Sequence, residues 1–236
     1  MPVYRLTDQI AFPNPSLATQ EGLLAVGGDL SPERLLFAYS LGIFPWYGED
    51  EPILWWAPDP RLVLFPNEIH VSRSLKKTLR QCRFSLRLDT AFRDVIRLCA
   101  EVRTSKNEPT WLLPEMMEAY SLLHDMGYAH CVEAWQQNQL VGGLYGVSLG
   151  RGFFAESMFH LATDASKVAL AFLASWLLRR DFLFMDCQVA TAHMQRMGAR
   201  QISRKLFTGL LEKALKAPTL RGKWSAAENN LPGSKS

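Results

Sequence analysis

The sequence lacks the patterns that mark several common functional classes. In its 236 residues, no apolar run reaches the roughly 18 residues that a membrane-spanning helix needs. Residues 1–9 show no basic stretch followed by an apolar core, so the sequence predicts no secretion signal. No GxxxxGK[ST] loop is present, which excludes P-loop nucleotide chemistry. We therefore expect a cytoplasmic protein without a membrane partner.

Cysteine is scarce and follows no metal-binding pattern. The four cysteines form no CxxC pair, and no histidine lies at zinc-ligand spacing from them. Each falls in an apolar stretch, which predicts buried free thiols in a reducing compartment rather than disulfides. No metal and no cofactor is expected. The cysteines are Cys82, Cys99, Cys131 and Cys187.

What the chain does contain is enough apolar material for a sizeable core. Hydrophobic residues make up 48% and charged residues 21% of it, which excludes a disordered composition. The length fits one large domain, or one domain with a small companion. The formal net charge of +3 permits an acidic partner but does not demand one.

Residues 1–60 predict a small N-terminal domain with one helix. Ser31 is the expected N-cap, Pro32 the first helical residue and Gly42 the stop. The prolines of the following segment, IFPWYGEDEPILWWAPDP, forbid a continuous helix. We expect an irregular aromatic segment there and a domain boundary near Pro60.

Residues 61–216 predict a larger α+β domain with a mixed, mostly antiparallel sheet flanked by helices. Strand-like runs over 129–136, 140–147 and 152–159 indicate an antiparallel meander, and the apolar run over 182–187 indicates a buried strand. The tail 217–236 is mostly polar and is expected to be loose, with Trp224 as the residue that could pack back. One helix is expected after Ser72, with an apolar face of Leu75, Leu79 and Cys82, and another after Thr90. Two more are expected over 114–127 and 166–179, and a short one that ends at Gly198. The last expected helix has an apolar face of Leu206, Phe207, Leu210, Leu211 and Ala214.

The helix after Ser72 also carries a stripe of positive charge. No acidic residue interrupts the sequence between Glu68 and Asp89. One interpretation is a solvated helix face; the other is contact with the phosphates of a nucleic acid. The stripe consists of Arg73, Lys76, Lys77 and Arg80, with Arg83 and Arg87 continuing the run.

Aromatic residues gather in and beyond the proline-rich segment. They are Trp46, Tyr47, Trp55, Trp56 and Trp111. They could fill a core between domains. Indoles near a basic stripe could instead stack on unpaired nucleotides, such as the 3′ end of a tRNA.

Two strings place carboxylates in apolar surroundings. In FFAESMF, strand alternation puts Glu156 on the face of Phe154 and Met158, where it is either ion-paired or functional. In FLFMDCQV, Asp186 and Gln188 follow a buried strand at its carboxyl end, where sites of α/β proteins collect. Asp186 could alternatively cap the next helix.

Together, several strings resemble the leucyl/phenylalanyl-tRNA–protein transferases over about residues 10–210. They are GLLAVGGDLSPERLLFAYSLGIFPWY, PILWWAPDPR, GGLYGVSLG, ESMF, ASKVAL and DCQV. The resemblance implies a small N-terminal domain packed on a domain similar to the GNAT acyltransferases. It also implies transfer of Leu or Phe, and less well Met, from aminoacyl-tRNA to proteins that begin with Arg or Lys. No ATP is needed, and the product carries a destabilising N-terminal residue. We expect a monomer.

The resemblance also implies residue roles. Asp186 would position Gln188 and hold the incoming amine, Gln188 would accept from that amine or donate to the ester oxygen, and Glu156 would attract the cationic acceptor. Trp46 and Trp111 would contact the terminal adenosine, and the basic stripe would contact the tRNA backbone. The matched aminoacyl pocket is Leu144, Phe153, Met158, Leu173 and Met185. The sequence departs from the family pattern at Leu144, Leu173, Thr191 and His160, which bears on the preference for Leu or Phe.

Three other functions compete with this one. A hydrolase could use Ser157, Asp186 and His193, but Ser157 lacks the glycines of GxSxG; its replacement by alanine would abolish a hydrolase and do little to a transferase. A CoA-dependent acetyltransferase would need a glycine-rich loop where the chain reads HLATDAS. A tRNA-binding module without activity would leave Glu156, Asp186 and Gln188 without a role.

Overall fold

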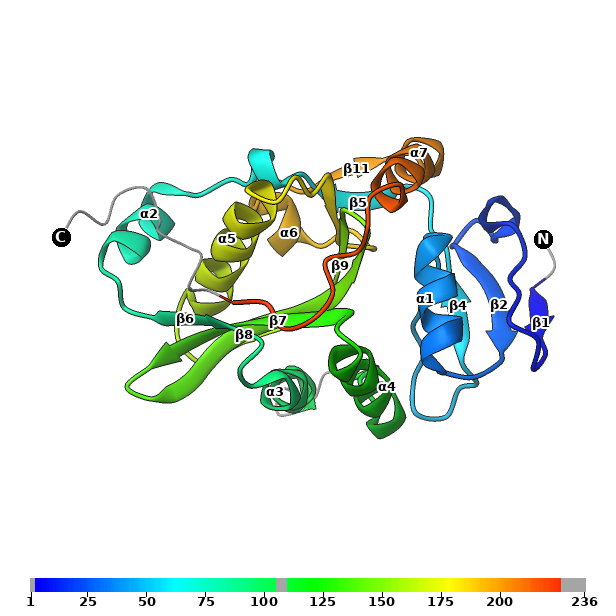
Figure 1. Ribbon diagram of the computed structural model, residues 1–236, viewed down its shortest axis with the longest axis horizontal. Coiled ribbons are helices and arrows are strands. Elements are labelled where there is room, and N and C mark those ends of the chain that lie inside the picture. The colour runs from blue at the N-terminus through cyan, green and yellow to red at the C-terminus, as the bar shows by residue number, and fades with distance from the viewer. Residues whose placement is uncertain (1–2, 105–109, 226–236) are drawn as a thin grey trace.

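The protein is an α+β molecule, as the sequence predicts, and it is built on two sheets (Figure 1). The structure is a computed structural model that describes residues 3–104 and 110–225. One sheet has four strands and the other has seven. Among the described residues, no helix is both long and apolar enough to cross a bilayer.

The N-terminal part contains a small sheet that the sequence did not predict. Its order is β1-β2-β4-β3, and helix α1 (Pro32–Ser40) packs beside it. The expectation of an irregular aromatic segment is therefore wrong, because strands this short, interrupted by proline, show no readable alternation. The predicted ends of α1 are confirmed: the Ser31 hydroxyl accepts from Arg34 N, and Gly42 has φ +75°. The strands are β1 (Tyr4–Leu6), β2 (Leu23–Gly27), β3 (Phe44–Pro45) and β4 (Leu54–Trp56), with a 3₁₀ turn at Pro15–Leu17.

The large sheet has the order β11-β5-β10-β9-β8-β7-β6. The predicted antiparallel meander is confirmed as β7 (Ala129–Gln136), β8 (Gln139–Leu149) and β9 (Gly152–His160). The predicted buried strand is β10 (Phe184–Asp186), which pairs with β9 in parallel. Sequence patterns missed the short strands β5 (Arg61–Leu64), β6 (Ser85–Leu88) and β11 (Arg200–Ile202).

Helices cover both faces of the large sheet and create two apolar cores (Figure 1). The first core lies under α3 (Phe92–Thr104), α4 (Pro114–Asp125) and α7 (Arg204–Leu215), and it continues into the N-terminal part through Trp55. The second core lies under α5 (Ala165–Leu178), with α2 (Arg73–Arg80) and α6 (Ala192–Arg196) nearby. The predicted face of α7 is wrong at Leu206, which is exposed.

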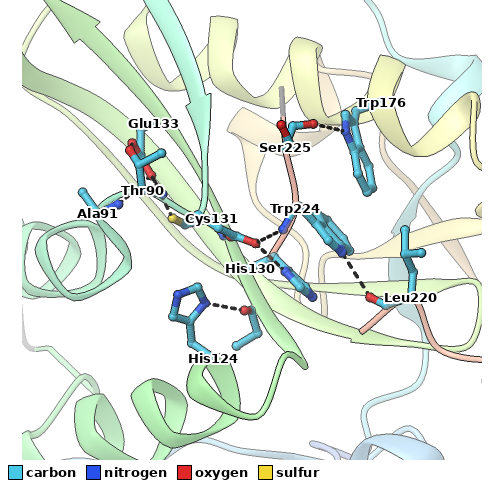
Figure 2. A network of polar contacts seen from close by, with 12 residues as sticks. Thr90, Ala91, His124, His130, Cys131, Glu133, Trp176, Leu220, Trp224 and Ser225 are labelled. Atoms are coloured by element: carbon cyan, nitrogen blue, oxygen red, sulfur yellow. Dashed lines mark hydrogen bonds and ion pairs between the residues drawn. The ribbon is translucent and has the colours of Figure 1, made fainter. Parts of the chain in front are cut away.

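The segment after α7 returns across the second core, as Figure 2 shows. Trp224 is buried, and its ring stacks on His130 at 3.7 Å and on Trp176 at 4.1 Å between centroids. Its backbone N–H donates to Asp89 Oδ2 at 2.7 Å. The expectation of a loose tail is therefore wrong at Trp224, where packing back was the alternative. Residues 226–236 of that tail lie outside the described residues.

Free thiols are confirmed, but their predicted burial is only partly correct. Cys99 and Cys131 are buried and Cys187 is half-buried, whereas Cys82 is exposed. Helix α2 ends at Arg80, and Cys82 has φ +45°, so the apolar helical face does not extend to it.

Candidate active site

A β-bulge on β9 places Glu156 in the site. Tyr145 of β8 pairs with Ser157, but Gly146 pairs with Ala155, so Glu156 is the extra residue. The bulge needs a glycine opposite it, because a Cβ on Gly146 would lie 2.1 Å from the Phe154 carbonyl oxygen. Because of the extra residue, the side chains on either side of the bulge do not follow the two-residue alternation of a regular strand.

The bulge also separates residues that the sequence placed together. Phe154 belongs to the first core, whereas Met158 packs against the second. The prediction that these three residues share a face is confirmed for Glu156 and Phe154, which both contact Tyr39, but it is wrong for Met158. Glu156 turns toward α1 and α4 while Met158 faces α5.

A cavity of about 450 Å³ lies beside the middle of β9 and just beyond the end of β10, next to the N-terminal part. That volume falls in the range of small-molecule sites. Glu156 and Gln188 are on its wall. The other lining residues are Phe44, Pro45, Trp46, Arg103, Trp111, Leu144, Ala155, Ser157, Met158, Leu170, Cys187, Val189, Thr191, His193 and Met194.

Glu156 is held by two tyrosines and by Gln188. Its Oε1 accepts from the Tyr39 hydroxyl at 2.7 Å and from Gln188 Nε2 at 2.9 Å, and its Oε2 accepts from the Tyr120 hydroxyl at 3.0 Å. The two hydroxyl oxygens also lie 2.7 Å apart. Tyr39 comes from α1, so the N-terminal part contributes directly to the site.

The proton count of this ring favours a neutral carboxyl at lower pH. An ionised Glu156 leaves only two hydroxyl protons for the three contacts among Tyr39, Tyr120 and Glu156. A protonated Glu156 supplies the third proton and completes the cycle. Burial, which disfavours the charged form, raises the pKa of Glu156 to about 7, although the hydrogen bonds from Tyr39, Tyr120 and Gln188 oppose the rise. Its charge therefore changes near neutral pH.

Asp186 is an internal anchor rather than a cavity residue. It is fully buried, and Arg61 Nε and Nη2 donate to its two oxygens at 2.8 and 2.6 Å. Arg61 is itself buried between the rings of Phe44 and Phe207. The expectation that Asp186 meets the incoming amine is thus corrected, because both oxygens are taken up inside the protein and neither lines the cavity.

Asp186 does fix Gln188. The backbone N–H of Gln188 donates to Asp186 Oδ1 at 2.9 Å, and the residue has φ +60°, which turns the chain out of the strand direction. The Gln188 side chain then reaches Glu156 through Nε2. Its side-chain Oε1 has no hydrogen-bond partner within the part of the chain that the structure describes, so it remains available to a ligand in the cavity.

Only part of the predicted aminoacyl pocket lines the cavity. Leu144 and Met158 do. Phe153, Leu173 and Met185 do not, since they are fully packed in the second core behind it. Ala155 and Leu170, which the sequence reasoning missed, take their places; Ala155 follows Phe153 on the same face of β9 and is small enough to leave space. The sequence motifs do not show which of these apolar residues line the cavity and which are packed behind it.

The aromatic residues divide into two groups. Trp46 is 44% exposed, and with Trp111 it lines the cavity. Trp55 and Tyr47 are buried, so they are structural; Trp55 Nε1 donates to the Gly27 carbonyl at 2.8 Å. Trp56 is half-buried, and its Nε1 donates to the Trp46 carbonyl oxygen at 2.6 Å.

The basic stripe is exposed on α2 and just after it, and none of its members lines the cavity. Within the described residues, no ion pair involves its members. Thr78 on the other face of α2 donates to Asp164 Oδ2 at 3.1 Å, which joins α2 to the start of α5. The exposed members are Arg73, Lys76, Lys77, Arg80, Arg83 and Arg87.

The structure removes two alternatives. Asp186 caps no helix, because the cap of α6 is the Thr191 hydroxyl, which accepts from Met194 N. A hydrolytic triad is absent as well: Ser157 Oγ and His193 Nε2 have no hydrogen-bond partner among the described residues, and Asp186 is paired with Arg61.

Two family models match the chain. Residues 63–212 match the family model described as leucyl/phenylalanyl-tRNA protein transferase, and residues 28–59 match that of its N-terminal domain. The curated leucyl/phenylalanyl-tRNA–protein transferase of Desulfatibacillum aliphaticivorans is 59% identical over 98% of this chain and 99% of its own. That of Syntrophobacter fumaroxidans is 61% identical over 89% of this chain and 90% of its own.

Two solved structures that the chain resembles are more distant in sequence. The structure of L-PGS from Bacillus licheniformis has a TM-score of 0.40 and 10% identity, covering 84% of this chain and 66% of its own. A GCN5-related N-acetyltransferase-like protein from Streptococcus suis has a TM-score of 0.37 and 13% identity, covering 69% of this chain and 60% of its own.

Proposed function

The chain belongs to the leucyl/phenylalanyl-tRNA protein transferase family, and we propose that it moves Leu or Phe, and less well Met, from aminoacyl-tRNA to the N-terminal Arg or Lys of acceptor proteins. The observation that carries the proposal is the fixed Gln188, whose amide is held by Glu156 and whose backbone is held by Asp186 at the edge of an apolar cavity. The modified protein is then marked for degradation, in the cytoplasm, and the enzyme acts as a monomer.

The reaction is aminolysis of an ester. The acceptor amine forms a bond to the ester carbonyl carbon, and the bond to the ribose oxygen breaks, so the hydroxyl of the tRNA leaves with a proton. An α-amino group has a pKa of about 7.7–8.0, so a useful fraction is already neutral near pH 7. Orientation therefore matters more than a strong base. The free Oε1 of Gln188 accepts a hydrogen bond from the amine and so orients the nitrogen lone pair toward the ester.

Glu156 has two roles in this proposal. It keeps the amide of Gln188 in one orientation through the Nε2 hydrogen bond. When ionised, it also attracts the cationic acceptor residue. Because its pKa is about 7, it can take up the proton that the attacking amine releases.

The cavity separates donors by shape. Leu144, Met158 and Leu170 give the aminoacyl side chain an apolar wall, and Trp46 and Trp111 offer ring faces to the terminal adenine. An apolar slot distinguishes side chains by only about 1–3 kcal/mol per methylene, so tolerance of methionine is expected.

The α2 stripe is proposed to contact the tRNA backbone, and salt dependence tests it. Replacing Arg73, Lys76, Lys77 and Arg80 by glutamine should raise the KM for Leu-tRNA about tenfold or more. The slope of log KM against log salt should fall by about 0.7–0.9 for each phosphate contact removed. The matched control replaces Arg93 and Arg97, which are exposed on α3 but ion-paired. An unchanged slope in the α2 variant would contradict the assignment.

One assay tests the proposed function. The protein is mixed with Leu-tRNA and a peptide beginning with Arg, without ATP, and mass spectrometry should show one added leucine. The same peptide with an acetylated N-terminus is the control and should stay unmodified. If the protein binds Leu-tRNA but adds no leucine, it is a binding module and the proposal fails.

A further inference from the structure

Within the described residues, the cavity wall carries one cation and one hydroxyl that have no partner. Arg103, in the last turn of α3, lines the cavity and is half-buried. Within the described residues it takes part in no ion pair or hydrogen bond. The other arginines of α3, by contrast, are satisfied: Arg93 pairs with Glu118 and Asp125, and Arg97 pairs with Asp94 and Glu101.

Two hydroxyls without partners among the described residues come from the paired strands β8 and β9, against which α3 packs. Ser157 is 8% exposed and lines the same cavity, yet its Oγ has no hydrogen-bond partner among the described residues. Tyr145, directly opposite Ser157 across β8 and β9, is fully buried, and its hydroxyl also has no partner. A buried hydroxyl without a partner costs free energy, so such a group usually has a ligand or water to satisfy it.

These groups are close enough to act together. Arg103 and Ser157 line the same cavity, and helix α3, which carries Arg103, packs against β8 and β9, which carry Tyr145 and Ser157. The guanidinium of Arg103 and the hydroxyl of Ser157 can therefore reach one ligand in that cavity. A guanidinium with a hydroxyl donor is suited to an oxyanion, above all to a phosphate.

We propose that Arg103 and Ser157 bind the phosphate on the 5′ side of the donor's terminal nucleotide. This rests on the proposed function. Charge decides between the two substrates, because the acceptor brings an N-terminal cation that Arg103 repels, whereas the donor brings phosphates. Position agrees with charge: Trp111, which offers a ring to the terminal base, lines the cavity together with Arg103. The phosphate contact fixes the nucleotide while Gln188, elsewhere on the wall, orients the amine.

The test uses a pair of donors that differ only in that phosphate. One is 3′-O-leucyl-adenosine, and the other is the same ester of adenosine 5′-monophosphate. Arg103→Met keeps most of the apolar stem and removes the charge. The variant should raise the KM for the phosphate-bearing donor about tenfold, as expected for one charge-assisted hydrogen bond, and leave that for the other donor within about twofold.

Two further variants sharpen the result. Ser157→Ala should raise the KM for the phosphate-bearing donor about threefold, since its hydrogen bond is the weaker one. Arg97→Met, on the same helix, should change neither KM, and all three variants should keep the melting temperature of the unmodified protein. If neither small donor is turned over, both are measured as competitive inhibitors of Leu-tRNA, with Ki in place of KM.

The outcomes separate the two ideas. Equal effects of Arg103→Met on both donors, or no effect on either, would overturn the phosphate site while leaving leucine transfer intact. Failure of the unmodified protein to transfer leucine from Leu-tRNA would instead overturn the proposed function.

Discussion

Replacing Glu156 by alanine is expected to lower kcat/KM for transfer to an Arg-starting peptide by about 100-fold or more, the usual scale for loss of a group that handles protons in the transition state. The change removes the acceptor for Gln188 Nε2 and leaves the hydroxyls of Tyr39 and Tyr120 with only each other. The amide of Gln188 is then free to turn. Steady-state kinetics at several pH values measure the effect.

Glu156→Gln separates the charge of the group from its shape. In the unmodified protein, kcat/KM should rise with pH in two steps: one near the pKa of Glu156, about 7, as the carboxyl ionises, and one at about 7.7–8.0 as the acceptor amine loses its proton. The glutamine variant should be slower by about tenfold or more at pH 8 and should keep only the amine step. A variant that retains both steps would show that Glu156 is not the group titrating near neutrality.

Arg61→Met is expected to lower the free energy of unfolding by about 3–5 kcal/mol, because it leaves the buried Asp186 carboxylate without its partner. Both side chains are inaccessible to water, and two hydrogen bonds join them. Urea unfolding followed by circular dichroism measures the loss. Arg200→Met is the matched control: its bridge to Glu68 at 3.1 Å is exposed, so its loss should cost about 1 kcal/mol or less.

The double variant Arg61→Met, Asp186→Leu distinguishes stability from function. Replacing a buried ion pair by apolar residues often restores stability, so most of the lost free energy should return. Activity should not, because the Gln188 backbone N–H has lost its acceptor on Asp186. Recovery of activity together with stability would show that the pair serves only the fold.

Much of the fold could be predicted because it depends on local patterns. The caps of α1 and α2 need one hydroxyl each at a fixed position, and the meander β7–β9 repeats a two-residue alternation between turns. The short strands of the N-terminal sheet could not be predicted in this way. Strands such as β3 (Phe44–Pro45) are too short to show a period, and their pairing comes from neighbours far along the chain.

In the candidate site, too, local sequence patterns identified some features and distant segments determined the others. The sequence motifs identified Glu156, Asp186 and Gln188 and the family, since the residue types and their order are local. They could not show that Asp186 is closed off by Arg61, which is 125 positions away. Nor could they show that Phe153, Leu173 and Met185 pack behind the cavity, because depth within a core depends on which elements cover it.

The sequence by itself therefore determined the elements with clear periods, the unpaired thiols and the chemical groups of the site. Tertiary structure decided which of those groups meet solvent in the cavity and which are held inside. The physical reason is that side-chain type and spacing are encoded by neighbours in the chain, whereas burial, ion pairing and the pKa of Glu156 depend on distant segments that reach the same place only after folding.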